Sequence, residues 1–123
     1  RVVLIERTNI RYIERSAVPE SIALTVIDES FISLTNVLPS ILPFLAPNAR
    51  VITLVKPQFE VGAGKLGKRG IVSDPALFRT VETRLRDCAG QLGLTVRAWL
   101  ESPLAGGDGN REFFMWLHYC PVK

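Results

Sequence analysis

The stretch Val51-Ile52-Thr53-Leu54-Val55-Lys56-Pro57 decides the fold. Its run of apolar and β-branched residues is typical of a strand buried on both faces, as in a parallel sheet covered by helices. Pro57 favours extended backbone at Lys56 and ends the strand there. The pattern therefore predicts a cation on rigid backbone at the carboxyl end of a central strand, where open α/β sheets place their ligands. A solvated lysine at a strand end is the alternative, and spacing alone does not separate the two.

Outward from this strand, buried strands alternate with amphipathic segments. The Asp74-Pro75 pair is a strong helix start, because the carboxylate caps the first turn and proline tolerates the first helical position. Gly93 supplies a left-handed cap at the end of that helix. The other predicted elements are strands at 1–5, 22–27, 94–100 and 112–119, and a helix at 33–45.

These elements predict an α/β fold with a mostly parallel sheet and an antiparallel C-terminal hairpin. The last two strands are joined by residues 102–110, a connection too short for a helical crossover, so they should run antiparallel. The aromatic residues of this hairpin are expected to pack on helices rather than to stack on bases. They are Trp99, Phe113, Phe114 and Trp116.

Composition narrows the class of protein. A chain of 123 residues is one domain at most, and 47% apolar residues exclude disorder. No apolar run reaches the length of a membrane span. The two cysteines, Cys88 and Cys120, lack metal-ligand spacing, so no metal is expected and a reduced, cytoplasmic protein is the default. A net charge of +3 permits a polyanionic partner.

The loop at 60–74 is rich in glycine and basic residues, and we expect it to be mobile. Its Gly62–Gly67 segment fits the G-x-G-x-x-G pattern, and Gly62–Lys68 nearly fits a P-loop. Both motifs need a strand directly before the glycines and a helix opening at them, and neither condition is predicted here. Lys65, Lys68 and Arg69 suit contact with a phosphate backbone better, and a solvated loop is the plain alternative.

Three ionisable residues share one topological position. Asp28 ends one buried strand, Lys56 ends the next, and Glu112 opens the antiparallel last strand at the same edge. Two carboxylates beside one lysine can orient its amine and tune its proton affinity. Such a lysine can take or steer a proton from an alcohol nucleophile. An ordinary ion pair is the alternative.

A resemblance to a known family is carried by several strings. They are Glu6-Arg-Thr-Asn-Ile-Arg11, Asp28-Glu-Ser-Phe-Ile-Ser-Leu34, Leu54-Val-Lys-Pro-Gln-Phe-Glu60, Gly70-Ile-Val-Ser-Asp-Pro75, Ser102-Pro-Leu-Ala-Gly and Gly109-Asn-Arg-Glu112. In order and spacing they resemble the TlyA-type haemolysin family, which is related to FtsJ-type RNA 2′-O-methyltransferases that use S-adenosylmethionine. The Val-Lys-Pro-Gln-Phe-Glu string is the most specific part.

The resemblance implies a Lys-Asp-Lys-Glu catalytic set, of which Asp28, Lys56 and Glu112 match the last three members. It implies cofactor contacts by Glu6, Arg7 and Asp28, and an RNA substrate, in the first instance ribosomal RNA. Glu29 departs from the small apolar residue that is usual after the aspartate.

By the same resemblance, residues 1–123 are the C-terminal portion of a methyltransferase domain. Residues 1–5 match its third strand, so the sheet would lack its first two strands, and an S4-like domain, the first catalytic lysine and the glycine-rich cofactor loop would precede Arg1. The strand at 22–27 would then have an unpaired apolar edge. We expect the chain either to form a homodimer through this edge or to dock its own N-terminal strand there.

Two other functions remain open at this level. The chain can be a non-catalytic module of methyltransferase fold that binds RNA or a protein. A haemolysin-like membrane activity is the other, but neither predicted helix has the strongly cationic face of a lytic amphipathic helix.

Overall fold

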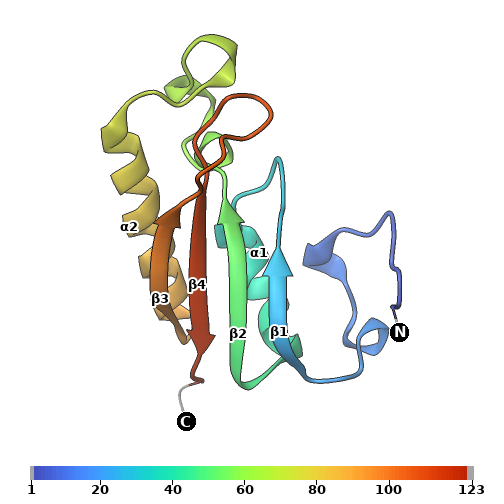
Figure 1. Cartoon of the computed structure of the whole chain (residues 1–123). Coiled ribbons are helices and arrows are strands. Elements are labelled where there is room, and N and C mark those ends of the chain that lie inside the picture. Colours follow the sequence, from blue (N-terminus) through green and yellow to red (C-terminus); the bar gives the residue numbers. More distant parts are fainter. Residues whose placement is uncertain (1, 122–123) are drawn as a thin grey trace.

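The computed structural model describes residues 2–121, apart from the side chain of Ala63. Four strands and two helices form the frame of these residues (Figure 1). In chain order they are β1 (Ile22–Ile27), α1 (Leu34–Ile41), β2 (Leu45–Val55), α2 (Pro75–Gln91), β3 (Leu94–Glu101) and β4 (Phe113–Tyr119). Short 3-10 turns occur at Ile10–Tyr12, Arg15–Ala17, Leu42–Phe44, Pro57–Phe59, Ala63–Lys65 and Lys68–Gly70.

The strands form one sheet in the order β1-β2-β4-β3. β1 and β2 are parallel, whereas β4 runs antiparallel to both β2 and β3. The predicted hairpin and the alternation of strands with helices are confirmed. The described sheet is mixed: β1, β2 and β3 run in one direction, and β4 lies between β2 and β3 so that both of its pairings are antiparallel.

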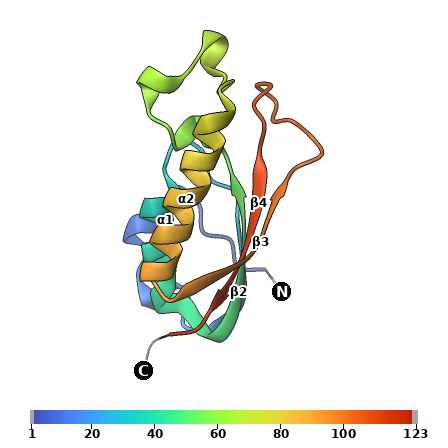
Figure 2. The same cartoon turned by 90° about the vertical axis from the view of Figure 1, so that its left-hand side faces the viewer.

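Both helices cover the same face of the sheet (Figure 2). Asp74 caps α2 by accepting a hydrogen bond from the Ala76 amide at 2.9 Å, as predicted. Gly93, which follows the C-terminal end of α2, has the predicted left-handed backbone with a φ of 79°. α1 begins after Ser33, whose side chain accepts from the Thr35 amide at 3.1 Å. The helices and the covered sheet face share one core, to which Leu38, Val51, Leu85, Met115 and Leu117 contribute fully buried side chains.

Within residues 2–121, neither α1 nor α2 lies on the opposite face of the sheet (Figure 2). Because successive strand residues point to opposite faces, Phe113 faces the core and its ring lies 5.4 Å from that of Phe78. Phe114 and Trp116 point the other way and are 37% and 42% exposed. The prediction that all four hairpin aromatics pack on helices is therefore wrong for these two.

β2 begins earlier than the predicted strand at 51–55. Ile22 pairs with Leu45 but Leu24 pairs with Arg50, so β2 carries extra residues in between. Asn48 has a φ of 65° within this irregular part. The Pro47-Asn48 turn chemistry is thus accommodated as a bulge in the strand.

The strand predicted at 1–5 is wrong for residues 2–5, which are non-strand and exposed; Arg1 lies outside the described residues. An extended segment without a neighbour has no partner for its backbone groups and gains nothing from strand geometry. The outer edge of β1 also has no strand partner within residues 2–121, so docking of the N-terminal segment on this edge does not occur. Dimerisation through it stays a prediction.

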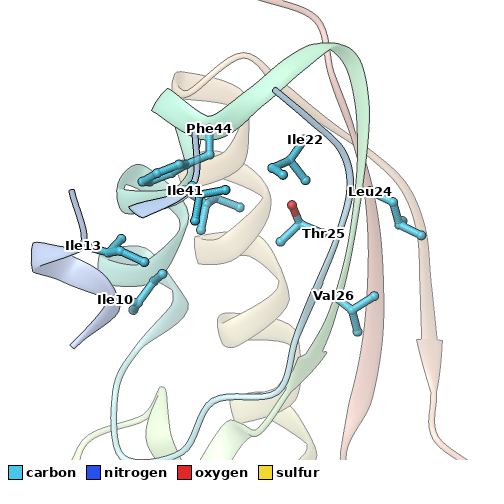
Figure 3. A pocket seen from close by; sticks show the side chains of 9 residues that line it. Ile10, Ile13, Ile22, Leu24, Thr25, Val26, Ile41 and Phe44 are labelled. Atoms are coloured by element: carbon cyan, nitrogen blue, oxygen red, sulfur yellow. The ribbon is translucent and has the colours of Figure 1, made fainter. Parts of the chain in front are cut away.

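An apolar groove of about 300 Å³ lies beside that edge (Figure 3). Ile10 and Ile13 line it from the N-terminal segment, Ile22 from β1, and Ile41 and Phe44 from α1 and the turn that follows. The groove holds no titratable side chain, so it supplies no chemistry of its own.

Candidate functional site

Lys56 and Asp28 meet at the carboxyl edge of the two parallel strands. The Lys56 Nζ atom lies 2.6 Å from the Asp28 Oδ1 atom and donates to the Ser30 hydroxyl at 3.1 Å. The lysine side chain is 15% exposed and the aspartate side chain 62% exposed. An ion pair with one partner this exposed contributes about 0–1 kcal/mol to stability. The stability of the fold therefore gives little reason for placing these two residues together.

Glu112 reaches the same edge from the antiparallel side. Val55 pairs with Phe113, so Glu112 is one step beyond this pair and opposite Lys56. Its carboxylate, however, lies against Gly106, where a Cβ atom would be 2.5 Å from the Glu112 Oε2 atom. No ion pair joins Glu112 to Lys56 in the described part of the chain. The structure therefore brings Asp28 and Lys56 into contact and places Glu112 nearby without closing the predicted set of three.

A rigid turn follows Lys56. The amide of Phe59 donates to the carbonyl of Lys56 at 2.9 Å, and Pro57 and Gln58 are buried. The ring of Phe59 lies 4.9 Å from that of Phe31, which is 90% exposed and has a φ of 66°. A bulky residue in the left-handed region is strained, and such strain concentrates at functional sites. Sequence reasoning missed Phe31 as a site residue, because its helical spacing assigns it to the apolar stripe of the helix predicted at 33–45, and its exposure shows that this assignment is wrong.

A polar cleft of about 560 Å³ adjoins Phe31. Thr8, Asn9 and Arg11 line it from one side, and Glu29 and Ser30 from the loop after β1. The predicted cofactor residues Glu6 and Arg7 directly precede this lining and are exposed. Neither they nor Asp28 belong to the lining itself.

The glycine-rich loop is organised by short turns rather than by a helix. α2 begins only at Pro75, so no helix opens at the glycines and neither nucleotide-binding motif has its required context. Lys65, Lys68 and Arg69 are all exposed. In Figure 1 this loop and the β3–β4 loop lie at the same end of the sheet, the end that carries Lys56.

A buried asparagine joins those two loops. Asn110 accepts a hydrogen bond from the Val72 amide at 2.9 Å and donates to the Gly70 carbonyl at 3.1 Å. It also donates to Asp108 through its backbone and its side chain, which lowers the pKa of that carboxyl. Gln58 donates to the same carboxylate at 3.2 Å. The turn after Lys56 and the loop before Glu112 are thereby connected, a link that no sequence signal indicated.

Other chemistries have less support. No group of three or more histidine, cysteine or acidic side chains is placed to hold a metal ion in the described residues. Burial raises the pKa of the Cys88 thiol, with a contribution from the charge of Glu60, which keeps this thiol protonated. Among residues 2–121, none of the helices is both long and apolar enough for a membrane crossing.

The fold and the site define an α/β protein with an ion-paired lysine at the carboxyl edge of its sheet and a basic loop beside it. The model of the FtsJ-like methyltransferase family matches residues 1–119, and the chain belongs to this family.

Two named methyltransferases are similar to this chain over most of the chain's length. It is 43% identical over 117 residues to the 16S/23S rRNA (cytidine-2'-O)-methyltransferase TlyA of Mycobacterium tuberculosis, covering 95% of this chain and 44% of the relative. It is 42% identical over 123 residues to the putative rRNA methyltransferase YqxC of Bacillus subtilis, covering 97% of this chain and 43% of the relative. The chain thus spans less than half the length of these relatives.

Two solved structures share the fold closely. The crystal structure of a putative hemolysin from Lactococcus lactis superposes with a TM-score of 0.91 at 38% identity, over 96% of this chain and 57% of that one. A putative hemolysin from Streptococcus thermophilus superposes with a TM-score of 0.88 at 34% identity, over 94% of this chain and 42% of that one.

Proposed function

We propose that the chain is the C-terminal portion of an S-adenosylmethionine-dependent methyltransferase that modifies a ribose 2′-hydroxyl of ribosomal RNA. The observation that carries this proposal is the Lys56–Asp28 pair at the carboxyl edge of a sheet of the FtsJ-like family. The relatives named as ribosomal RNA cytidine-2'-O-methyltransferases support the substrate class. Such an enzyme acts in the cytoplasm, where ribosomes are assembled.

The polar cleft fits part of the cofactor. Its volume of about 560 Å³ and its hydroxyl, amide and charged lining suit a nucleoside, and binding sites of this kind place a few polar groups to fix orientation. Thr8, Asn9 and Glu29 would contact it there, with Glu6 and Arg7 at the entrance. When bound, S-adenosylmethionine supplies an electrophilic methyl group.

Lys56 acts on the nucleophile. Its Nζ atom holds the ribose 2′-hydroxyl by a hydrogen bond or, in its neutral amine form, accepts the hydroxyl proton, while Asp28 accepts a hydrogen bond from the same nitrogen and fixes its direction. Glu112 completes the set when its carboxylate turns from Gly106 toward the lysine. Much of the acceleration then comes from alignment of the reacting atoms.

Phe31 adds a contact surface beside the reacting groups. Its exposed ring, held against Phe59, can stack on a nucleobase, because every base offers a π face to an aromatic side chain.

The direct test is transfer of labelled methyl from S-adenosylmethionine to ribosomal RNA, followed by analysis of the nucleosides. The assay uses the chain joined to the N-terminal part that its relatives carry, beside the 123-residue chain alone. We expect 2′-O-methylated nucleosides from the joined protein and little or no transfer by the chain alone. RNA binding without any transfer by the joined protein would support the non-catalytic binding module instead.

The basic loop is expected to bind RNA phosphates. Replacing Lys65, Lys68 and Arg69 with glutamine should weaken RNA binding and reduce the slope of log affinity against log salt by about 2, since each lost phosphate contact on a single strand contributes about 0.7. Affinity is measured by fluorescence anisotropy at several salt concentrations. Glutamine at Arg79, Arg86 and Arg97 removes the same charge from exposed positions on α2 and β3 and should leave the slope nearly unchanged. Equal effects of the two triple variants would contradict a specific role of the loop.

Gly106→Ala is expected to displace the Glu112 carboxylate. The added Cβ atom would lie 2.5 Å from the Glu112 Oε2 atom, so this flexible side chain has to move away, and 3.1 Å from the Asp108 Oδ1 atom, which has to give by only a few tenths of an ångström. If Glu112 assists Lys56, the rate of methyl transfer should change severalfold, while the free energy of unfolding changes by less than about 0.5 kcal/mol. Gly107→Ala is the matched control, because nothing lies within 4 Å of a Cβ atom there. Identical rates for the two variants would remove Glu112 from the mechanism.

A further inference from the structure

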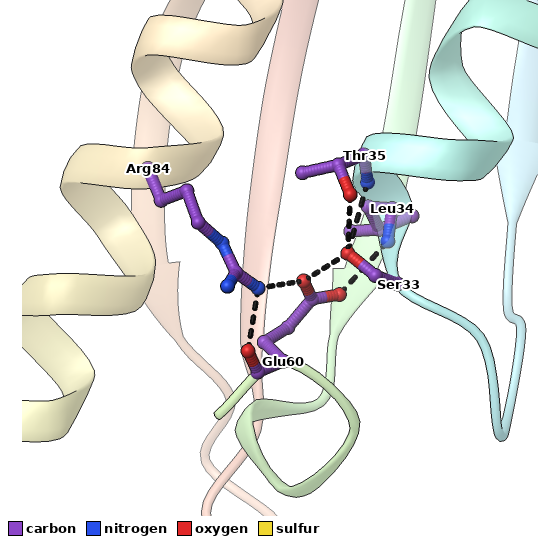
Figure 4. A network of polar contacts seen from close by, with 5 residues as sticks. All are labelled: Ser33, Leu34, Thr35, Glu60 and Arg84. Carbon is purple, nitrogen blue, oxygen red and sulfur yellow. Dashed lines mark hydrogen bonds and ion pairs between the residues drawn. The ribbon is translucent and has the colours of Figure 1, made fainter. Parts of the chain in front are cut away.

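We propose that Glu60 is a positioning residue that fixes the loops carrying Asp28 and Lys56, an inference that rests on the proposed function. The Glu60 side chain is 2% exposed, in contrast to Asp28. Its carboxylate accepts three hydrogen bonds: from the Ser33 hydroxyl at 2.6 Å, from the Leu34 amide at 2.9 Å and from the Arg84 Nη2 atom at 3.0 Å (Figure 4).

The carboxylate and its partners come from three separate parts of the chain. Ser33 and Leu34 form the start of α1, Arg84 lies on α2, and Glu60 itself ends the turn after β2. Arg84 also donates to the backbone carbonyl of Glu60, so it holds this residue at two points. Buried charge is tolerated only when it is paired and hydrogen-bonded, and here both conditions are met.

The carboxylate connects the two halves of the candidate site. Asp28 and Ser33 lie on the loop from β1 to α1, and Lys56 and Glu60 lie on the turn after β2. The amide of Glu60 donates to the carbonyl of Pro57 at 2.9 Å, so the turn is continuous from Lys56 to Glu60. Loosening the bond between Glu60 and α1 would let the two loops separate and would misplace the Lys56 Nζ atom relative to Asp28.

A capping role alone predicts something different. Ser33 already caps α1 by accepting from the Thr35 amide, so loss of Glu60 as a mere cap would lower stability and leave the rate constant of the folded enzyme unchanged. A positioning role predicts loss of the rate constant in protein that is still folded and still binds RNA.

The test is Glu60→Gln in the joined, methyl-transferring protein, assayed in single turnovers with saturating RNA and cofactor below the unfolding temperature. The glutamine keeps the shape but replaces one acceptor oxygen with a donor group. We expect the rate constant to fall up to about 100-fold, because small misplacements of reacting groups have effects of that size, while RNA affinity is retained. Glu82→Gln is the matched control, since it removes a carboxylate paired with Arg86 at the surface of α2.

A double-mutant cycle separates positioning from general damage. If Glu60 acts through the ion pair, Glu60→Gln should cause a smaller additional loss in an Asp28→Asn background than in the wild type. An equal loss in both backgrounds, or a rate constant unchanged by Glu60→Gln, would overturn the proposal.

Hydrogen exchange of the same proteins distinguishes failure of this inference from failure of the proposed function. If the wild-type protein transfers no methyl group, the proposed function fails. Hydrogen exchange still reports whether the hydrogen bonds of Glu60 hold the two loops in place. Faster exchange in residues 28–34 and 56–60 of the Glu60→Gln variant, with β4 unchanged, supports the positioning of the loops. Unchanged exchange in both segments overturns it.

Discussion

Lys56→Ala in the joined, methyl-transferring protein is expected to lower the rate constant of methyl transfer by about 10²- to 10⁴-fold, the range typical for loss of a positioned acid or base. The reason is local: the Lys56 Nζ atom is held by Asp28 and Ser30 at the edge where the ribose would bind. RNA affinity should change little, because one half-buried cation is a small part of a phosphate-binding surface. Single-turnover transfer with saturating RNA measures the effect.

Lys56→Arg separates two roles of this lysine. Arginine stays protonated at any accessible pH and cannot accept a proton, but it can still donate hydrogen bonds to an oxygen. A base mechanism therefore predicts that Lys56→Arg is as slow as Lys56→Ala, whereas pure orientation predicts partial activity. If Lys56→Ala transfers methyl at the wild-type rate, Lys56 has no catalytic role and the pair with Asp28 is only structural.

Leu85→Ala is expected to have the largest effect on stability, lowering the free energy of unfolding by about 2–5 kcal/mol. Leu85 lies in the middle of the apolar face of α2 and is 0% exposed. Truncation removes contacts with the core and leaves a cavity that the close-packed neighbours fill only in part. Urea unfolding, followed by far-ultraviolet circular dichroism, measures the change.

Leu100→Ala is the control for this truncation. Leu100 lies on the helix-free face of the sheet and is 63% exposed, so the same change should cost less than about 1 kcal/mol. A similar loss from both variants would mean that the helix-free face is covered in solution. That result would point to a partner on this face, and it would agree with the predicted homodimer if the loss depended on protein concentration.

Local signals were sufficient for much of the frame. The Asp74-Pro75 start and the Gly93 cap of α2 were predicted because they are backbone effects of neighbouring residues. The antiparallel hairpin followed from a connection too short for a helix. The contact of Asp28 with Lys56 could be anticipated because parallel neighbouring strands end at the same edge.

Only the tertiary structure decided which surfaces are covered and which side chains meet across loops. Phe114 and Trp116 are large aromatic residues of the type usually buried in a core. They are nevertheless partly exposed, because both helices lie on the other face of the sheet. Residues 2–5 are apolar and suited to a strand, but strand geometry needs a neighbour. The carboxylate of Glu60 binds Arg84 and the start of α1, contacts between residues far apart in the chain. Hydrophobic periodicity and helix capping depend on residues close together in the chain, so they can be predicted from the sequence. Burial and long-range polar contacts depend on how the helices and strands pack.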